Sequence, residues 1–121
     1  MQMITHALPR AVADCIAACN NHNPDGFMAT FAPDALVNDN RREFLGHAAI
    51  RAWADKELFG DNVTCVVERG YEQHGDVIVH CRTDGDYDKT NLPDPLILSW
   101  YFSLRDGRIT QLIIILNTVL A

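Results

Sequence analysis

The segment that most constrains the fold is the apolar run Leu112-Ile113-Ile114-Ile115-Leu116. Its β-branched residues favour a strand, and a strand that is apolar at every position needs cover on both faces of its sheet. One face can pack against helices of the same chain. The other face would be covered by a second copy of the protein or by the chain's own residues 119–121. We expect a homodimer that uses the outer sheet face, through Tyr101, Ile113 and Ile115.

Four strand patterns occupy the C-terminal half of the chain and form two pairs. Residues 63–69 and 77–83 are joined through His74-Gly75-Asp76. Residues 96–104 and 109–117 flank Asp106-Gly107, a dipeptide typical of hairpin turns. This pattern predicts an antiparallel sheet made of consecutive hairpins.

Three helices are predicted before these strands. Residues 8–21 have apolar side chains at helical spacing, and Pro9 suits a first turn. A second, short helix has Phe27, Met28 and Phe31 on one side, and Pro33-Asp34 ends it before a strand that reaches Asp39. The third helix stops near Gly60 and has these residues on one face: Ala49, Ile50, Trp53, Ala54 and Glu57.

Composition excludes several functional classes. A net charge of −6 and a pI near 5.1 argue against nucleic-acid binding, which requires a clustered basic face. No apolar stretch approaches the roughly 20 residues of a membrane span, and the first residues lack the layout of a signal peptide. The four cysteines form no C-x-x-C pair and fit no zinc pattern with histidine, so we expect buried free thiols and no metal. These features predict a single cytoplasmic domain over residues 1–121.

Three motifs in this order resemble the nuclear transport factor 2-like superfamily, in particular its SnoaL-like and ketosteroid-isomerase-like branches. They are Phe31-Ala32-Pro33-Asp34-Ala35-Leu36-Val37, then Phe44-x-Gly46-x-x-Ala49-Ile50-x-x-Trp53, then Asp106-Gly107-Arg108-Ile109. The resemblance implies an α+β, cone-shaped fold in which a curved, mostly antiparallel sheet wraps three helices around a pocket. The superfamily includes isomerases, cyclases, hydrolases and proteins without catalysis, so the fold leaves the function open.

The resemblance also suggests roles for individual residues. In ketosteroid isomerases a carboxylate at the end of the first long strand moves the proton, and the matching residue is Asp39. The two oxygen donors that stabilise the oxyanion in those enzymes fall on Cys15 and Trp100. Neither replaces the original pair, although the Trp100 indole N–H can donate one hydrogen bond. Each lost donor typically costs about 2.7–4 kcal/mol of transition-state stabilisation, which argues against steroid isomerisation.

Two hypotheses follow for the function. The first is a cofactor-independent isomerase- or cyclase-type enzyme in which Asp39 is the general base for a small apolar carbonyl compound. The alternative is a dimeric domain that binds a small molecule or a partner without catalysis. For both, we expect the pocket to be lined by Cys15, Phe44, Trp53, Glu57, Leu98 and Trp100. If Asp39 and Glu57 meet, they could share one proton as an acid/base pair.

Overall fold

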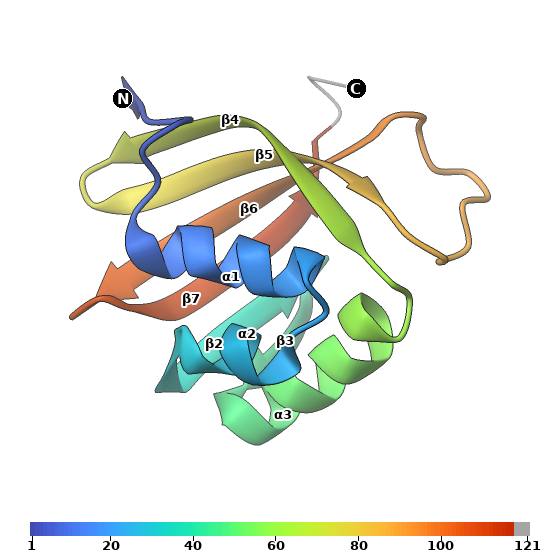
Figure 1. The fold of residues 1–121 in the computed structure, drawn as a ribbon, viewed down its shortest axis with the longest axis horizontal. Helices are drawn as coiled ribbons and strands as arrows, with labels where there is room; N and C mark the ends of the chain where they lie inside the picture. The colour runs from blue at the N-terminus through green and yellow to red at the C-terminus, as the bar shows by residue number, and fades with distance from the viewer. Residues whose placement is uncertain (118–121) are drawn as a thin grey trace.

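Seven strands form one sheet, and three helical segments lie together on one side of it, as Figure 1 shows for the computed structural model of the chain. The structure describes residues 1–117. The strands are β1 (Gln2–Met3), β2 (Phe31–Asp39), β3 (Arg42–Leu45), β4 (Thr64–Gln73), β5 (Asp76–Asp84), β6 (Leu96–Arg105) and β7 (Arg108–Leu116). The helices are α1 (Arg10–Asn20), α2 (Pro24–Ala29) and α3 (Gly46–Trp53), which continues as a π-helical segment, η1 (Ala54–Phe59).

The sheet order is β1-β4-β5-β6-β7-β2-β3. The pairs β4–β5, β5–β6 and β6–β7 are antiparallel, as the two predicted hairpins require. Strand β2 runs parallel to β7, and the long connection between them, from β3 to β6, replaces the short turn that only an antiparallel pair can use. The predicted α+β fold, with a curved and mostly antiparallel sheet, is confirmed.

The sequence prediction was wrong around Phe31 and Pro33. Phe31 was expected in the second helix, but it is the first residue of β2 and pairs with Ile109 of β7. The Pro33-Asp34 step was expected to end a helix, and instead it lies where the register between β2 and β7 shifts, before Leu36. Proline is tolerated at such an irregularity because no ladder hydrogen bond is needed from its nitrogen.

Two short strands and one helical distortion were also missed. Strand β1 pairs with β4, and β3 forms a tight hairpin with β2. At the end of α3, the N–H of Gly60 donates to the carbonyl of Asp55, at 2.9 Å, which is the i→i+5 spacing of a π-helix. Elements of two to six residues are too short to show a period in the sequence.

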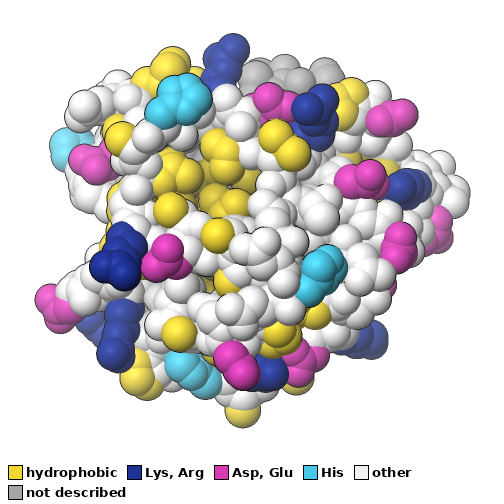
Figure 2. Space-filling view, in the orientation of Figure 1, with side chains coloured by type: hydrophobic (Ala, Val, Ile, Leu, Met, Phe, Trp, Pro, Cys, Tyr) yellow, Lys and Arg dark blue, Asp and Glu magenta, His cyan; other side chains and the backbone are white. Residues whose placement is uncertain are grey.

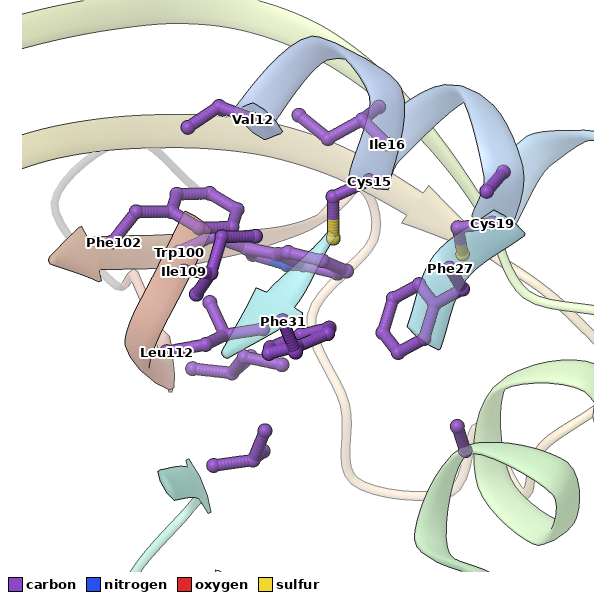
Figure 3. Packing of buried hydrophobic residues seen from close by; sticks show 14 of the residues in the cluster. Val12, Cys15, Ile16, Cys19, Phe27, Phe31, Trp100, Phe102, Ile109 and Leu112 are labelled. Atoms are coloured by element: carbon purple, nitrogen blue, oxygen red, sulfur yellow. The ribbon is translucent and has the colours of Figure 1, made fainter. Parts of the chain in front are cut away.

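The core lies between the inner face of the sheet and the helices. Figure 3 shows Val12, Cys15 and Ile16 of α1 facing Trp100, Phe102 and Leu112 of the sheet. Alternation in β6 places Leu98 and Trp100 on this inner side and Tyr101 on the outer side, as predicted. On the outer face, Ile115 is 41% exposed. Residues 119–121, the alternative cover for that face, lie outside the described residues.

Candidate functional site

The turn between β2 and β3 places Asp39 beside Arg42. The two turn residues, Asn40 and Arg41, have φ values of 51° and 72°, in the left-handed region. Asn38 stabilises this turn, because its Oδ1 accepts a hydrogen bond from the Arg41 N–H at 2.8 Å. Asp39 and Arg42 are therefore opposite one another in the hairpin register, with their side chains on the same face of the sheet.

The Arg42 guanidinium lies between two carboxylates. Its Nη2 donates to Asp39 Oδ2 at 2.8 Å and to Glu57 Oε1 at 2.6 Å, while Nη1 donates to Glu57 Oε2 at 2.9 Å. Glu57 reaches this position from the π-helical segment η1. The hydrogen bond with Glu57 and the charge of both carboxylates raise the pKa of Arg42. Because a cation separates them, Asp39 and Glu57 do not form the proton-sharing pair considered from the sequence.

Two aromatic side chains complete this cluster, which we call the Asp39 network: Asp39, Arg42, Phe44, Trp53 and Glu57. The Trp53 indole Nε1 donates to Asp39 Oδ2 at 3.1 Å. The Phe44 and Trp53 rings stack with centroids 5.9 Å apart, and the Arg42 guanidinium carbon lies 5.7 Å from the Phe44 centroid. Four candidates from the sequence, two of them predicted on one helix, thus come together around one arginine.

The Asp39 network lies at the edge of the core rather than inside it. The Asp39 side chain is 23% exposed and that of Arg42 is 52% exposed. Both contacts of the carboxylate use Oδ2, and among the described residues Oδ1 has no hydrogen-bond donor. One oxygen of Asp39 is therefore available to a ligand or to solvent.

Of the remaining candidates, Cys15 and Trp100 are buried in the core, and Leu98 is half-buried and packs against it. Figure 3 shows Cys15 pointing from α1 toward Trp100, so the two positions that match the oxyanion donors of ketosteroid isomerases do face each other. Trp100 is 1% exposed, and its Nε1 has no hydrogen-bond partner among the described residues. Burial raises the pKa of the Cys15 thiol, which keeps that side chain neutral. The hydrogen bonds of the described residues do not link this pair to the Asp39 network.

The sequence analysis missed a polar cluster on the outer sheet face. His80 Nδ1 lies 2.8 Å from Ser99 Oγ, and the Asn117 amide donates to Ser99 Oγ at 2.9 Å. Burial lowers the pKa of His80, and the charge of Arg69 adds to this effect. Ser99 is only 1% exposed, which leaves no room for a substrate at its hydroxyl. The β5–β6 register could have revealed this pair, since His80 is directly opposite Ser99.

Neither a metal centre nor a membrane span is found in residues 1–117. No three or more side chains of His, Cys, Asp or Glu in this range are grouped so that they could hold a metal ion. In the same range, no helix is long and apolar enough to cross a membrane.

Comparison with known proteins identifies the family and the fold. Residues 12–112 match the model of the SnoaL-like domain. No functionally curated protein matches the chain. Among solved structures, a protein from Sinorhizobium meliloti proposed to be a polyketide cyclase is 25% identical, with a TM-score of 0.82 over 92% of this chain and 98% of that one.

More distant structures share the fold alone. An NTF2-like protein of unknown function from Cytophaga hutchinsonii is 17% identical, with a TM-score of 0.73 over 97% of this chain and 93% of its own. The Δ5-3-ketosteroid isomerase from Mycobacterium sp. is 15% identical, with a TM-score of 0.70 over 88% and 90% of the respective chains. A proposed cyclase, an isomerase and a protein of unknown function therefore share this architecture.

Proposed function

We propose that this chain, which belongs to the SnoaL-like domain family, binds a small apolar carbonyl compound between α1 and the sheet. The observation that carries this proposal is the indole N–H of Trp100, which is buried without a partner among the described residues. An unsatisfied buried donor typically costs about 1–3 kcal/mol. A ligand carbonyl oxygen that accepts this hydrogen bond would recover that free energy.

The surroundings of Trp100 suit an apolar ligand body. Cys15 and Leu98 offer apolar contact beside it, and neither side chain carries charge. Figure 2 shows hydrophobic side chains gathered in a hollow just above α1, beside the strands of the sheet. We propose that a ligand enters there and displaces α1 slightly from the sheet, because the interior around Trp100 is filled by side chains.

The two tryptophans provide a direct test. In a ¹⁵N spectrum of the full chain, titration with 2-tetralone or a similar small aryl ketone is expected to shift the indole signal of Trp100. Trp100→Phe assigns that signal and should weaken binding at least tenfold, whereas Trp53→Phe should retain binding. Ketones that shift only the Trp53 signal, or neither signal, would overturn this assignment.

A second candidate function is a cofactor-independent, isomerase- or cyclase-type proton transfer with Asp39 as general base. Asp39 Oδ1, which accepts no hydrogen bond from residues 1–117, favours it, because that oxygen can accept a proton while Oδ2 stays bound to Arg42 and Trp53. The S. meliloti structure, proposed to be a polyketide cyclase, adds support at the level of the fold. The replacement of the oxyanion donors by Cys15 and Trp100 still argues against steroid isomerisation.

Hydrogen–deuterium exchange tests the proton transfer without knowledge of the natural substrate. A general base that removes an α-proton should accelerate deuterium incorporation into 2-tetralone in D₂O, as followed by NMR. Asp39→Asn should abolish this acceleration, whereas Asp55→Asn, at an exposed ion pair with Arg51, should preserve it. Equal exchange rates with wild type and Asp39→Asn would exclude Asp39 as the base.

We further propose that the chain forms a cytoplasmic homodimer through the outer sheet face at Tyr101, Ile113 and Ile115. Ile115, which is 41% exposed, supports this surface, since a large apolar side chain exposed on a sheet face favours contact. Light scattering should give twice the chain mass at micromolar concentration. Ile115→Lys should give the monomer mass, whereas Val66→Lys, at a position that is 53% exposed on β4, should leave the dimer intact.

A further inference from the structure

The loop between β5 and β6, residues 85–95, is fixed to the segment that precedes β4. The N–H of Asp86 donates to the carbonyl of Asp61 at 2.7 Å, and Asn62 Nδ2 donates to Asp86 Oδ2 at 2.7 Å. The backbones also approach closely, since a Cβ added at Gly85 would lie 2.9 Å from the Asp61 carbonyl oxygen. Figure 1 shows this loop to the right of the sheet.

A cavity of about 680 Å³ lies between this loop and the ends of β4 and β5. Two of its lining side chains, Val66 and Leu92, are large and apolar but 53% and 39% exposed. Tyr87 also lines the cavity, and its hydroxyl donates to the carbonyl of Thr83 at 3.2 Å. Small-molecule sites in proteins typically have volumes of about 300–1,000 Å³ and combine apolar contact with a few polar groups. This cavity has both features.

The charged side chains that line the cavity are Arg82, Asp84, Lys89 and Asp94. Lys89 Nζ lies 2.9 Å from Asp84 Oδ1. Arg82 Nε lies 3.3 Å from Glu68 Oε1, outside the cavity lining. Both cations are therefore paired, whereas Asp94 forms no ion pair with any of residues 1–117. The carboxylate that remains favours a positively charged ligand, as does the chain's net charge of −6.

The Tyr87 ring also favours a cation. Lys89 Nζ lies 5.7 Å from the centroid of this ring, within the range of a cation–π contact. The Lys89 side chain is 60% exposed, and an exposed ion pair adds little stability, so Lys89 can move aside for a ligand. A ligand ammonium group in this cavity would then have an aromatic ring and the carboxylate of Asp94 as partners.

We propose that this cavity is a second binding site, for a small molecule that has an apolar body and one ammonium group. The ammonium group donates to the Asp94 carboxylate, near the Tyr87 ring, and the apolar body lies against Val66 and Leu92. This site is distinct from the carbonyl site proposed at Trp100, because the two share no lining residue.

Titration of the ¹⁵N-labelled full chain with 2-phenylethylamine tests this site. At neutral pH this probe is an ammonium ion. We expect saturable shifts at millimolar amine in the amide signals of cavity-lining residues such as Thr64, Tyr87 and Leu92, while the indole signal of Trp100 stays in place. 2-Phenylethanol, which has the same apolar body without the charge, should bind about fivefold more weakly.

Variants separate the contributions of the carboxylate and the ring. Asp94→Asn should weaken binding of the amine about fivefold. Asp88→Asn is the matched control and should retain binding, because Asp88 is an exposed acid of the same loop that does not line the cavity. Tyr87→Leu should weaken binding, whereas Tyr87→Phe keeps the aromatic ring and should retain it.

The titration of the wild type locates the ligand by itself, so the test stays valid if a variant fails to fold. Equal affinities for the amine and the alcohol would show that the cavity does not recognise charge, and would overturn the proposal. Equal losses in Asp94→Asn and Asp88→Asn would do the same. Shifts spread over the surface without saturation would mean that the amine is attracted only by the net charge, and shifts confined to Trp100 would assign it to the other site; either result would refute the second site.

Discussion

The Arg42 guanidinium holds the Glu57 carboxylate through two hydrogen bonds, of 2.6 and 2.9 Å. This bidentate pair links β3, at the edge of the sheet, to the π-helical segment η1. Arg42 also holds Asp39, so removing it would leave two carboxylates facing the same space. The stability of the Asp39 network therefore depends on this arginine.

Arg42→Ala should lower the free energy of unfolding by about 1–3 kcal/mol, because hydrogen bonds to two half-buried carboxylates are lost. Arg51→Ala is the matched control, since Arg51 also bridges two acids, Asp25 and Asp55, but Asp25 is 90% exposed. The free energy of unfolding of Arg51→Ala should fall by less than about 1 kcal/mol. Urea unfolding measures both, and equal losses would contradict the structural role given to Arg42.

Trp53→Phe and Trp100→Phe should differ in stability although both tryptophans are buried. Each variant leaves a small cavity, but only Trp53→Phe loses a hydrogen bond, the 3.1 Å contact with Asp39 Oδ2. Trp100→Phe removes a donor that has no partner among the described residues. We expect Trp53→Phe to be less stable by about 1–3 kcal/mol in thermal or chemical unfolding without ligand. If Trp100→Phe were instead the less stable variant, Trp100 Nε1 would have a hydrogen-bond partner in solution.

Asn20→Ala should destabilise the chain by about 1–3 kcal/mol, because it removes both hydrogen bonds between the end of α1 and Cys65. Asn21→Ala, at the next and exposed position, is the control and should change stability by less than about 0.5 kcal/mol. Hydrogen exchange offers a second measurement: the Cys65 amide should exchange faster in Asn20→Ala only. Unchanged protection of that amide would show that Asn20 does not hold it.

His80 should make stability depend on pH. Its pKa is lowered in the folded chain by burial and by Arg69, and the side chain also contacts Tyr71, Ser99 and Asn117. An unfolded histidine titrates near about 6.5. Below about pH 6.5, His80 takes up a proton in the unfolded chain before it does so in the folded chain. The free energy of unfolding therefore falls as the pH decreases toward the folded pKa, and the full contribution of neutral His80 is present above about pH 6.5.

Urea unfolding at about pH 7.5 and about pH 5 measures this effect. Wild type should lose more stability between the two pH values than His80→Gln, in which the titrating group is absent. His22→Gln, in the exposed turn after α1, should behave like wild type. An identical pH dependence for wild type and His80→Gln would show that protonation of His80 does not oppose folding.

Hydrophobic periodicity alone determined much of the fold. The helical spacing before Asn21 predicts α1, and the Asp106-Gly107 turn between two apolar runs predicts the β6–β7 hairpin. These patterns are reliable because a long element must keep its apolar side chains on one face to be stable. The motif order identified the family, which the match over residues 12–112 confirms.

Tertiary structure alone decided the details of the candidate site. Asp39, Trp53 and Glu57 are recognisable as candidates from their places on a strand and a helix, but no pattern shows that Arg42 joins Asp39 to Glu57. That contact depends on a turn with two non-glycine residues at positive φ and on a π-helical segment, and neither has a periodic signature. The burial of the Trp100 N–H, without a partner in residues 1–117, likewise results from side chains far apart in the sequence that pack around it, so only the folded chain reveals it.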